Sequence, residues 1–190
     1  MTMLSDIVRW GGWAGVVAAV MYVLAGILIL TAPAQRVFSS ISEHLIEIIL
    51  VVAFVVTLVV IAGLHGLQRR RYGRLGAAGS LITFSGYALI VVVAAVTIRV
   101  GGEALFAVRL IGALAILIGS VLLGAMTLHA RVLPWWCGVL LIVGFPLGGV
   151  LDENVARGSE GIVFGIVWGL VGYALLSSSR PLDQQHARVR

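Results

Sequence analysis

A capping box marks the start of one long apolar segment, and the acids best placed to do chemistry follow it. Ser40 and Glu43 have the S-x-x-E spacing, so a helix is expected to begin near Ser40. Glu47 then shares a helix face with Glu43, and His44 lies one turn before Glu47. An acid held in apolar surroundings can donate a proton or bind a cation. Glu47 is therefore the candidate general acid, with Glu43, His44 or Asp152 as its assisting groups.

Arg109 is the basic residue expected at a depth similar to that of Glu47. It lies about one turn inside another apolar segment that starts from the same side of the membrane. An unpaired charge facing lipid is costly, so we predict an ion pair between Glu47 and Arg109 across the bundle. A structural interpretation competes with the catalytic one, because acids near a helix N-terminus also favour the helix dipole.

The composition excludes a soluble globular protein, a disordered chain and a disulfide scaffold, and it indicates a membrane protein. Of the 190 residues, 61% are hydrophobic and 11% are charged, against about 25% charged in an average soluble domain. A single cysteine, Cys137, excludes an internal disulfide and a site with several cysteine ligands. Glu43, His44 and Glu47 come from one helix, while His65 and His129 are expected at the other membrane face. No metal and no cofactor are predicted.

Apolar runs between charges indicate six membrane-spanning helices. A helix needs about 20 apolar residues to cross the hydrocarbon layer. The run from Trp10 to Ala34 is too long for a signal peptide, so it is interpreted as a retained helix. The predicted fold is an all-α polytopic transmembrane bundle in a single domain, 1–178, followed by a polar cytoplasmic tail, 179–190. The expected spans are 10–32, 44–66, 75–98, 105–128, 134–151 and 161–177.

Arginine asymmetry predicts the orientation. Most arginines fall in the segments that lie on one side of a six-helix layout, and the densest cluster consists of Arg69, Arg70, Arg71 and Arg74. The positive-inside rule then places both termini in the cytoplasm. The four clustered arginines are expected to contact anionic lipid headgroups. The basic surplus thus indicates topology rather than nucleic-acid binding, and the predicted location is a bacterial inner membrane.

Small residues at intervals of four predict close helix packing. Gly161, Gly165 and Gly169 follow this spacing in the last span, and Gly11 and Gly15 follow it in the first. Packing within one chain is one interpretation, and a seam with a second copy or another membrane protein is the alternative. A further expectation concerns the fifth span, which contains the sequence GFPLGG (residues 144–149) and is predicted to be broken there.

Two segments resemble parts of uncharacterised small multi-pass membrane proteins of GC-rich bacteria. They are the sequences ARVLPWWCGVLLIVG (residues 130–144) and RRRYGRLG (residues 69–76). The resemblance implies a six-helix membrane protein and transfers no site residue.

Three functions fit these patterns. The first is a non-enzymatic integral membrane protein that binds a lipid, or the transmembrane segment of a partner, in the outer half of the bundle. The second is an intramembrane enzyme that acts on an isoprenoid or other lipidic substrate, as membrane terpene cyclases do, with Glu47 as general acid. The third is a small ion or solute transport protein. An enclosed apolar pocket reaching Glu47 would favour the enzyme.

Overall fold

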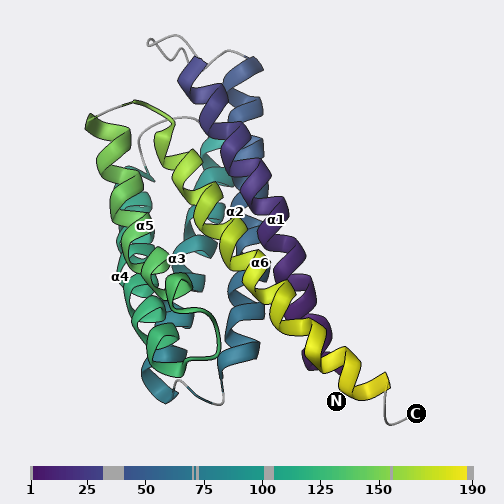
Figure 1. Ribbon diagram of the computed structural model, residues 1–190. Coiled ribbons are helices and arrows are strands. Elements are labelled where there is room, and N and C mark those ends of the chain that lie inside the picture. The colour runs from purple at the N-terminus through teal and green to yellow at the C-terminus, as the bar shows by residue number, and fades with distance from the viewer. Residues whose placement is uncertain are drawn as a thin grey trace.

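The computed structural model is an all-α bundle of six helices (Figure 1). It describes residues 2–31, 41–69, 71, 73–100, 105–154 and 156–187, with side chains described for 6–31, 44–69, 71, 73–97, 105–152, 154 and 156–179. The helices are α1 Thr2–Thr31, α2 Ile41–Gln68, α3 Gly73–Val100, α4 Phe106–Ala130, α5 Trp135–Asn154 and α6 Ser159–Ala187.

The described helices carry the apolar surface of a multi-pass membrane protein. All six are long and apolar enough to cross a membrane. In each span less than half of the most apolar stretch is buried within the bundle, so the rest of that apolar surface faces outward. Soluble proteins rarely expose contiguous apolar surface of this extent, whereas lipid covers it at no cost. A helix also satisfies its own backbone hydrogen bonds, which hydrocarbon requires. The predicted fold class is confirmed.

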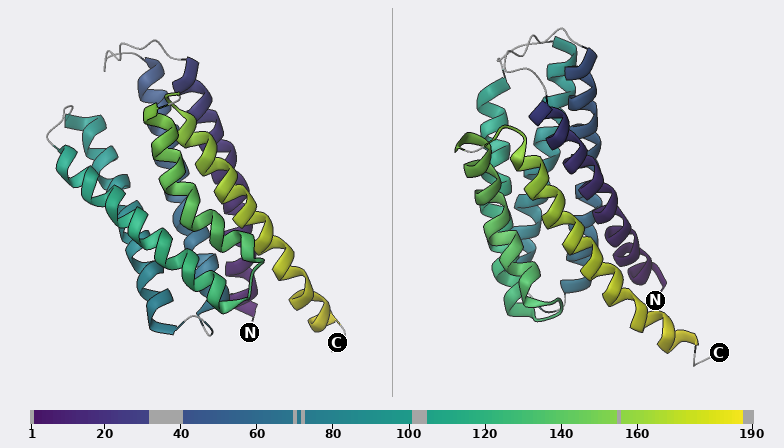
Figure 2. Two further views of the ribbon diagram at one scale, coloured as in Figure 1. Left: turned by 60° about the vertical axis from the view of Figure 1, so that its left-hand side comes forward. Right: turned by 45° about the horizontal axis from the view of Figure 1, so that its top comes forward.

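The helices form a closed ring in chain order. Each packs against its neighbours in the sequence, and α6 lies along α1 to close the ring (Figures 1 and 2). We call the end where α1 begins and α6 ends the terminal end, and the end that holds Gly158 the opposite end. The terminal end includes the hairpin between α2 and α3 and the turn between α4 and α5 (Figure 2).

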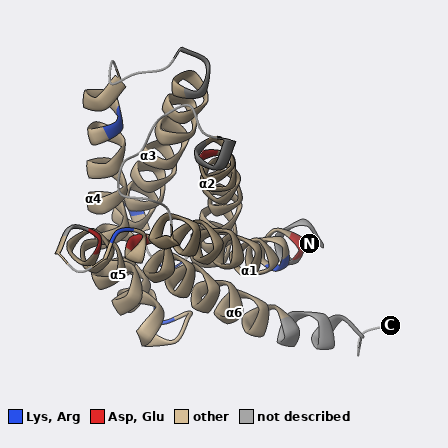
Figure 3. Cartoon of the chain, turned by 90° about the horizontal axis from the view of Figure 1, so that it is seen from above, with Lys and Arg blue, Asp and Glu red and all other residues tan. Residues whose placement is uncertain are grey.

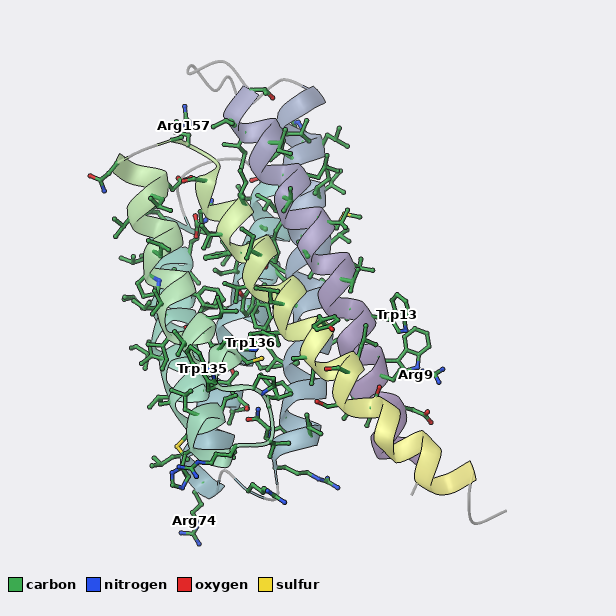
Figure 4. All side chains as sticks on the ribbon, in the orientation of Figure 1. Arg9, Trp13, Arg74, Trp135, Trp136 and Arg157 are labelled. Atoms are coloured by element: carbon green, nitrogen blue, oxygen red, sulfur yellow. The ribbon has the colours of Figure 1, made fainter. Side chains whose placement is uncertain are left out.

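Seen from above, the described ribbon carries only a few charged residues and is otherwise uncharged (Figure 3). Arg74 lies at the terminal end and Arg157 at the opposite end (Figure 4). Trp13 and Trp135 lie in the half towards the terminal end and are 55% and 71% exposed (Figure 4). These two exposed tryptophans therefore lie on the same side of the bundle as Arg74.

Glycines let the backbones of α1 and α6 approach closely. A Cβ atom built at Gly15 would lie 2.5 Å from Gly172 Cα, and one built at Gly161 would lie 3.0 Å from Gly26 Cα. Gly11 plays the same part between α1 and α2, where its Cβ would lie 2.8 Å from Gly63 Cα. The small-residue spacing therefore serves packing within the chain.

The other two glycines of the predicted seam also face α1. A Cβ built at Gly165 would lie 2.6 Å from Val23 Cγ2, and one built at Gly169 would lie 3.0 Å from Ala19 Cβ. Association with a second copy or another membrane protein through any of these glycines stays a prediction.

Two features of the helices differ from the expectations. The predicted break in the fifth span is wrong, because α5 runs without interruption from Trp135 to Asn154 with Pro146 inside it. Proline removes one backbone donor, which leaves the Ile142 carbonyl without its usual partner but does not end the helix. α6 extends beyond residue 177 to Ala187. The extension runs through two serines and Pro181, although serine and proline are poorer helix formers than alanine.

Candidate functional site

A cavity of about 710 Å³ lies inside the ring, in the half of the bundle towards the opposite end. All six helices contribute to its wall, so no single pair of helices defines it. The residues used below are Tyr22, Phe54, Tyr87, Arg109, Phe145, Pro146, Gly149, Asp152, Gly158, Glu160 and Phe164. We call this space the central cavity.

Five aromatic rings from five helices line the deeper part of the central cavity. We call Tyr22, Phe54, Tyr87, Phe145 and Phe164 together the aromatic floor. The ring centroids of Phe145 and Phe164 lie 4.6 Å apart, and those of Tyr22 and Phe54 lie 5.8 Å apart in an edge-to-face arrangement. Tyr87 contacts Phe54 at 5.8 Å and Phe145 at 6.4 Å. The floor is thus a continuous aromatic surface, with centroid spacings typical of stabilising ring pairs.

Hydrogen bonds hold the two tyrosines of the floor. The Tyr22 hydroxyl lies 3.3 Å from Thr57 Oγ1, and Trp168 Nε1 donates to the Tyr87 hydroxyl at 3.3 Å. All four of these side chains are buried. Buried polar groups in hydrocarbon need such partners, and the bonds fix the ring orientations as well. Trp168 also packs under the floor, with its centroid 5.9 Å from that of Phe145.

Pro146, Gly148 and Gly149 shape the part of the cavity wall that α5 forms, which we call the α5 wall. Gly149 faces the central cavity, and a Cβ built there would meet no atom within 4 Å. A Cβ built at Gly148 would instead lie 2.9 Å from Phe164 Cε1 and 3.4 Å from Glu160 Cγ. Gly148 therefore makes room for the α6 side chains, while Gly149 leaves room in the cavity. Pro146 lines the cavity beside them.

Two carboxylates and one guanidinium lie at the mouth of the central cavity. We call Asp152 and Glu160 the mouth acids. Glu160 lies close enough to Asp152 and to Arg109 for their charges to interact. Asp152 Oδ1 accepts a hydrogen bond from the backbone N–H of Gly158, which fixes one of its oxygens. The mouth therefore places two carboxyl groups and one guanidinium beside the aromatic floor.

Glu47 and Arg109, the residues of the predicted ion pair, line one smaller cavity between α2, α3 and α4. We call this space, of about 30 Å³, the side cavity; it has room for little more than a water molecule. The two residues thus share a face of the bundle rather than lying on opposite faces. The ion pair stays a prediction, and Arg109 also borders the central cavity, where it acts on Glu160.

The remaining predicted catalytic residues do not meet in one place. His44 is exposed near the start of α2 and has an interaction of its own, and the Glu43 side chain lies outside the described part of the chain. Asp152 borders the central cavity, whereas Glu47 borders the side cavity. No group of three or more histidine, cysteine, aspartate or glutamate side chains converges among the residues that the structure describes.

The residues predicted to contact lipid headgroups lie at the terminal end. Arg69, Arg71 and Arg74 are exposed there, and Arg70 is outside the described residues. Headgroup contact by this cluster stays a prediction. Cys137 is fully buried near the same end, in the packed part of the bundle.

Sequence reasoning missed Glu160 and the aromatic floor. One signal was available, because Glu160, Phe164 and Trp168 follow each other at intervals of four and so share one face of a helix. The other floor residues come from four separate spans. Nothing within one span indicates that these rings converge.

No protein-family model, no curated protein and no solved structure matches the chain. What the central cavity can bind therefore follows from its own residues.

Proposed function

We propose that the protein is an integral membrane protein that binds a lipidic small molecule in the central cavity. The observation that carries this proposal is a cavity of about 710 Å³ with an aromatic floor and a charged mouth. Small-molecule sites typically enclose about 300–1,000 Å³, with mostly apolar walls and a few polar groups that orient the ligand. The cavity also lies in the half of the bundle that arginine asymmetry predicts to be the outer one.

The size of the cavity favours a small molecule over a partner helix. A membrane-spanning helix about 10 Å wide and 30 Å long occupies roughly 2,400 Å³. The central cavity has less than a third of that volume. The glycines that were candidates for a partner seam contact helices of their own chain, as Gly15 contacts α6.

Two further observations favour binding over the catalytic and transport alternatives. Glu47, the candidate general acid, lines the side cavity, which is too small for a lipidic substrate. Below the floor, Leu64, Leu123, Leu141 and Leu175 are fully buried and pack the half towards the terminal end. A ligand held above this layer would have to displace closely packed side chains to reach the terminal end.

The proposal includes an orientation, with the terminal end in the cytoplasm and the central cavity towards the outer face of a bacterial inner membrane. Single cysteines placed at Arg74 or at Arg157 in a Cys137→Ala background test it with a membrane-impermeant thiol reagent added to intact cells. Labelling at position 157 but not at 74 is the expected result. The reverse pattern would contradict the orientation.

Filling the central cavity tests the binding proposal. The Gly149→Phe variant adds a ring where a Cβ meets open space, so it should fold and exclude the ligand. The matched control is Gly66→Phe, also in a helix, where a Cβ would make only an ordinary 3.6 Å contact with Ile7. The measurement is mass spectrometry of lipids that co-purify with each folded variant, identified as a monodisperse peak.

The wild type and Gly66→Phe should retain a co-purifying lipidic molecule that Gly149→Phe loses. Equal lipid content in all three proteins would show that the bound lipid does not occupy the central cavity, and the proposal would fail.

A further inference from the structure

We propose that the ligand of the central cavity is an organic cation, an amine or quaternary ammonium group attached to an apolar body. This inference rests on the proposed binding function and names the chemical class of the ligand. It combines two independent features of the central cavity, the aromatic floor and the mouth acids.

The aromatic floor suits a cation in particular. Aromatic faces carry partial negative charge, and several rings around one space attract an ammonium group when water is excluded. Five rings from five helices surround the deeper part of the cavity, and two of them are tyrosines held by Thr57 and Trp168. A purely aliphatic ligand would need only an aliphatic wall. The walls of the side cavity show that simpler lining, with Leu50, Val51 and Val93 around a single ring.

The mouth acids supply the negative charge. Asp152 and Glu160 lie close enough to interact with each other, and Glu160 lines the same cavity as the tyrosines of the floor. Charges inside a membrane protein are costly unless they are paired, so neighbouring carboxylates in such a place indicate a positive partner. A ligand cation between Glu160 and the floor would be that partner.

Among the residues that line the two cavities, acidic side chains outnumber basic ones. Arg109 borders both cavities, and the side cavity holds a third carboxylate, that of Glu47. Three carboxylates therefore share one guanidinium along the two cavity walls, and an anionic ligand would add to the excess negative charge.

Three probes with the same chain and different head groups test the inference. Decyltrimethylammonium, decanol and decyl sulfate are titrated below their micelle concentrations into the full-length protein in lipid nanodiscs, with empty nanodiscs as the blank. Calorimetry gives the dissociation constant of each. We expect the cation to bind at least tenfold more tightly than decanol, and decyl sulfate to bind most weakly.

Variants assign the preference to residues. Glu160→Gln should reduce cation affinity about tenfold and leave decanol affinity within about twofold. Phe164→Leu, which keeps the charge and removes one ring of the floor, should weaken the cation more than decanol. Asp6→Asn is the control, since Asp6 is an exposed acid at the terminal end. It should bind all three probes as the wild type does.

The outcomes separate this inference from the proposed function. Equal binding of the cation and decanol, both abolished by Gly149→Phe, would overturn the cation inference and leave lipid binding intact. A cation preference that survives both Glu160→Gln and Phe164→Leu would also overturn it. Absence of saturable binding by any probe, together with no co-purifying lipid, would overturn both.

Discussion

The α1–α6 seam and the α5 wall of the central cavity use the same residue type for opposite purposes. At Gly15 the missing side chain lets two backbones touch, since a Cβ would lie 2.5 Å from Gly172 Cα and 2.8 Å from the Trp168 carbonyl oxygen. At Gly149 the missing side chain leaves open space. In this bundle, glycine therefore marks a very close backbone contact at Gly15 and an open space at Gly149.

The largest expected effect comes from adding one methyl group at each of these two glycines. Gly15→Ala forces α1 away from the backbone of α6, so it should lower the free energy of unfolding by about 2–3 kcal/mol. The measurement is SDS-induced unfolding of the purified protein, followed by circular dichroism. Gly149→Ala is the matched control, and it should be neutral or stabilising by up to about 1 kcal/mol because alanine favours helix.

Equal destabilisation by the two alanine substitutions would contradict the contrast between a close contact at Gly15 and open space at Gly149. It would mean that the α5 wall is packed as tightly as the seam and that the central cavity does not exist in the folded protein.

Removing one hydrogen bond under the aromatic floor should have a smaller effect on the free energy of unfolding. Tyr87→Phe removes the acceptor of the buried Trp168 N–H, and it should lower the free energy of unfolding by about 1 kcal/mol. Tyr173→Phe is the control, since Tyr173 lies on the same helix as Trp168 and is 64% exposed. The same SDS titration measures both variants. If Tyr87→Phe matched its control, the floor would be held by packing alone.

Much of the fold follows from patterns within single spans. The Ser40 and Glu43 capping box predicted a helix start near Ser40, and α2 begins at Ile41. Runs between charges predicted six spans, because transfer of apolar residues into lipid depends on local composition. The error at GFPLGG has a local cause as well. Proline weakens a helix, but packing against neighbouring helices and self-contained backbone bonds kept α5 continuous.

The candidate site was far less predictable than the fold. Glu47 and Arg109 were expected at similar depth from their distance along each helix, and they line one cavity. Glu160 was not predicted as a site residue, although the sequence shows it four residues before Phe164 and eight before Trp168. Its importance depends on rings from other helices, and the rotation of each helix about its own axis is set by packing.

The sequence by itself determined that the chain crosses a membrane, how many helices do so, and which residues lie near each end. Those properties depend on the free energy of moving short segments between water and hydrocarbon, which is a sum over neighbouring residues. The meeting of five aromatic rings and Glu160 around one cavity arises only from tertiary packing. The five rings are those of Tyr22, Phe54, Tyr87, Phe145 and Phe164. Helix rotation and close approach depend on contacts between residues far apart in the chain, such as Gly15 with Gly172, and no single segment contains that information.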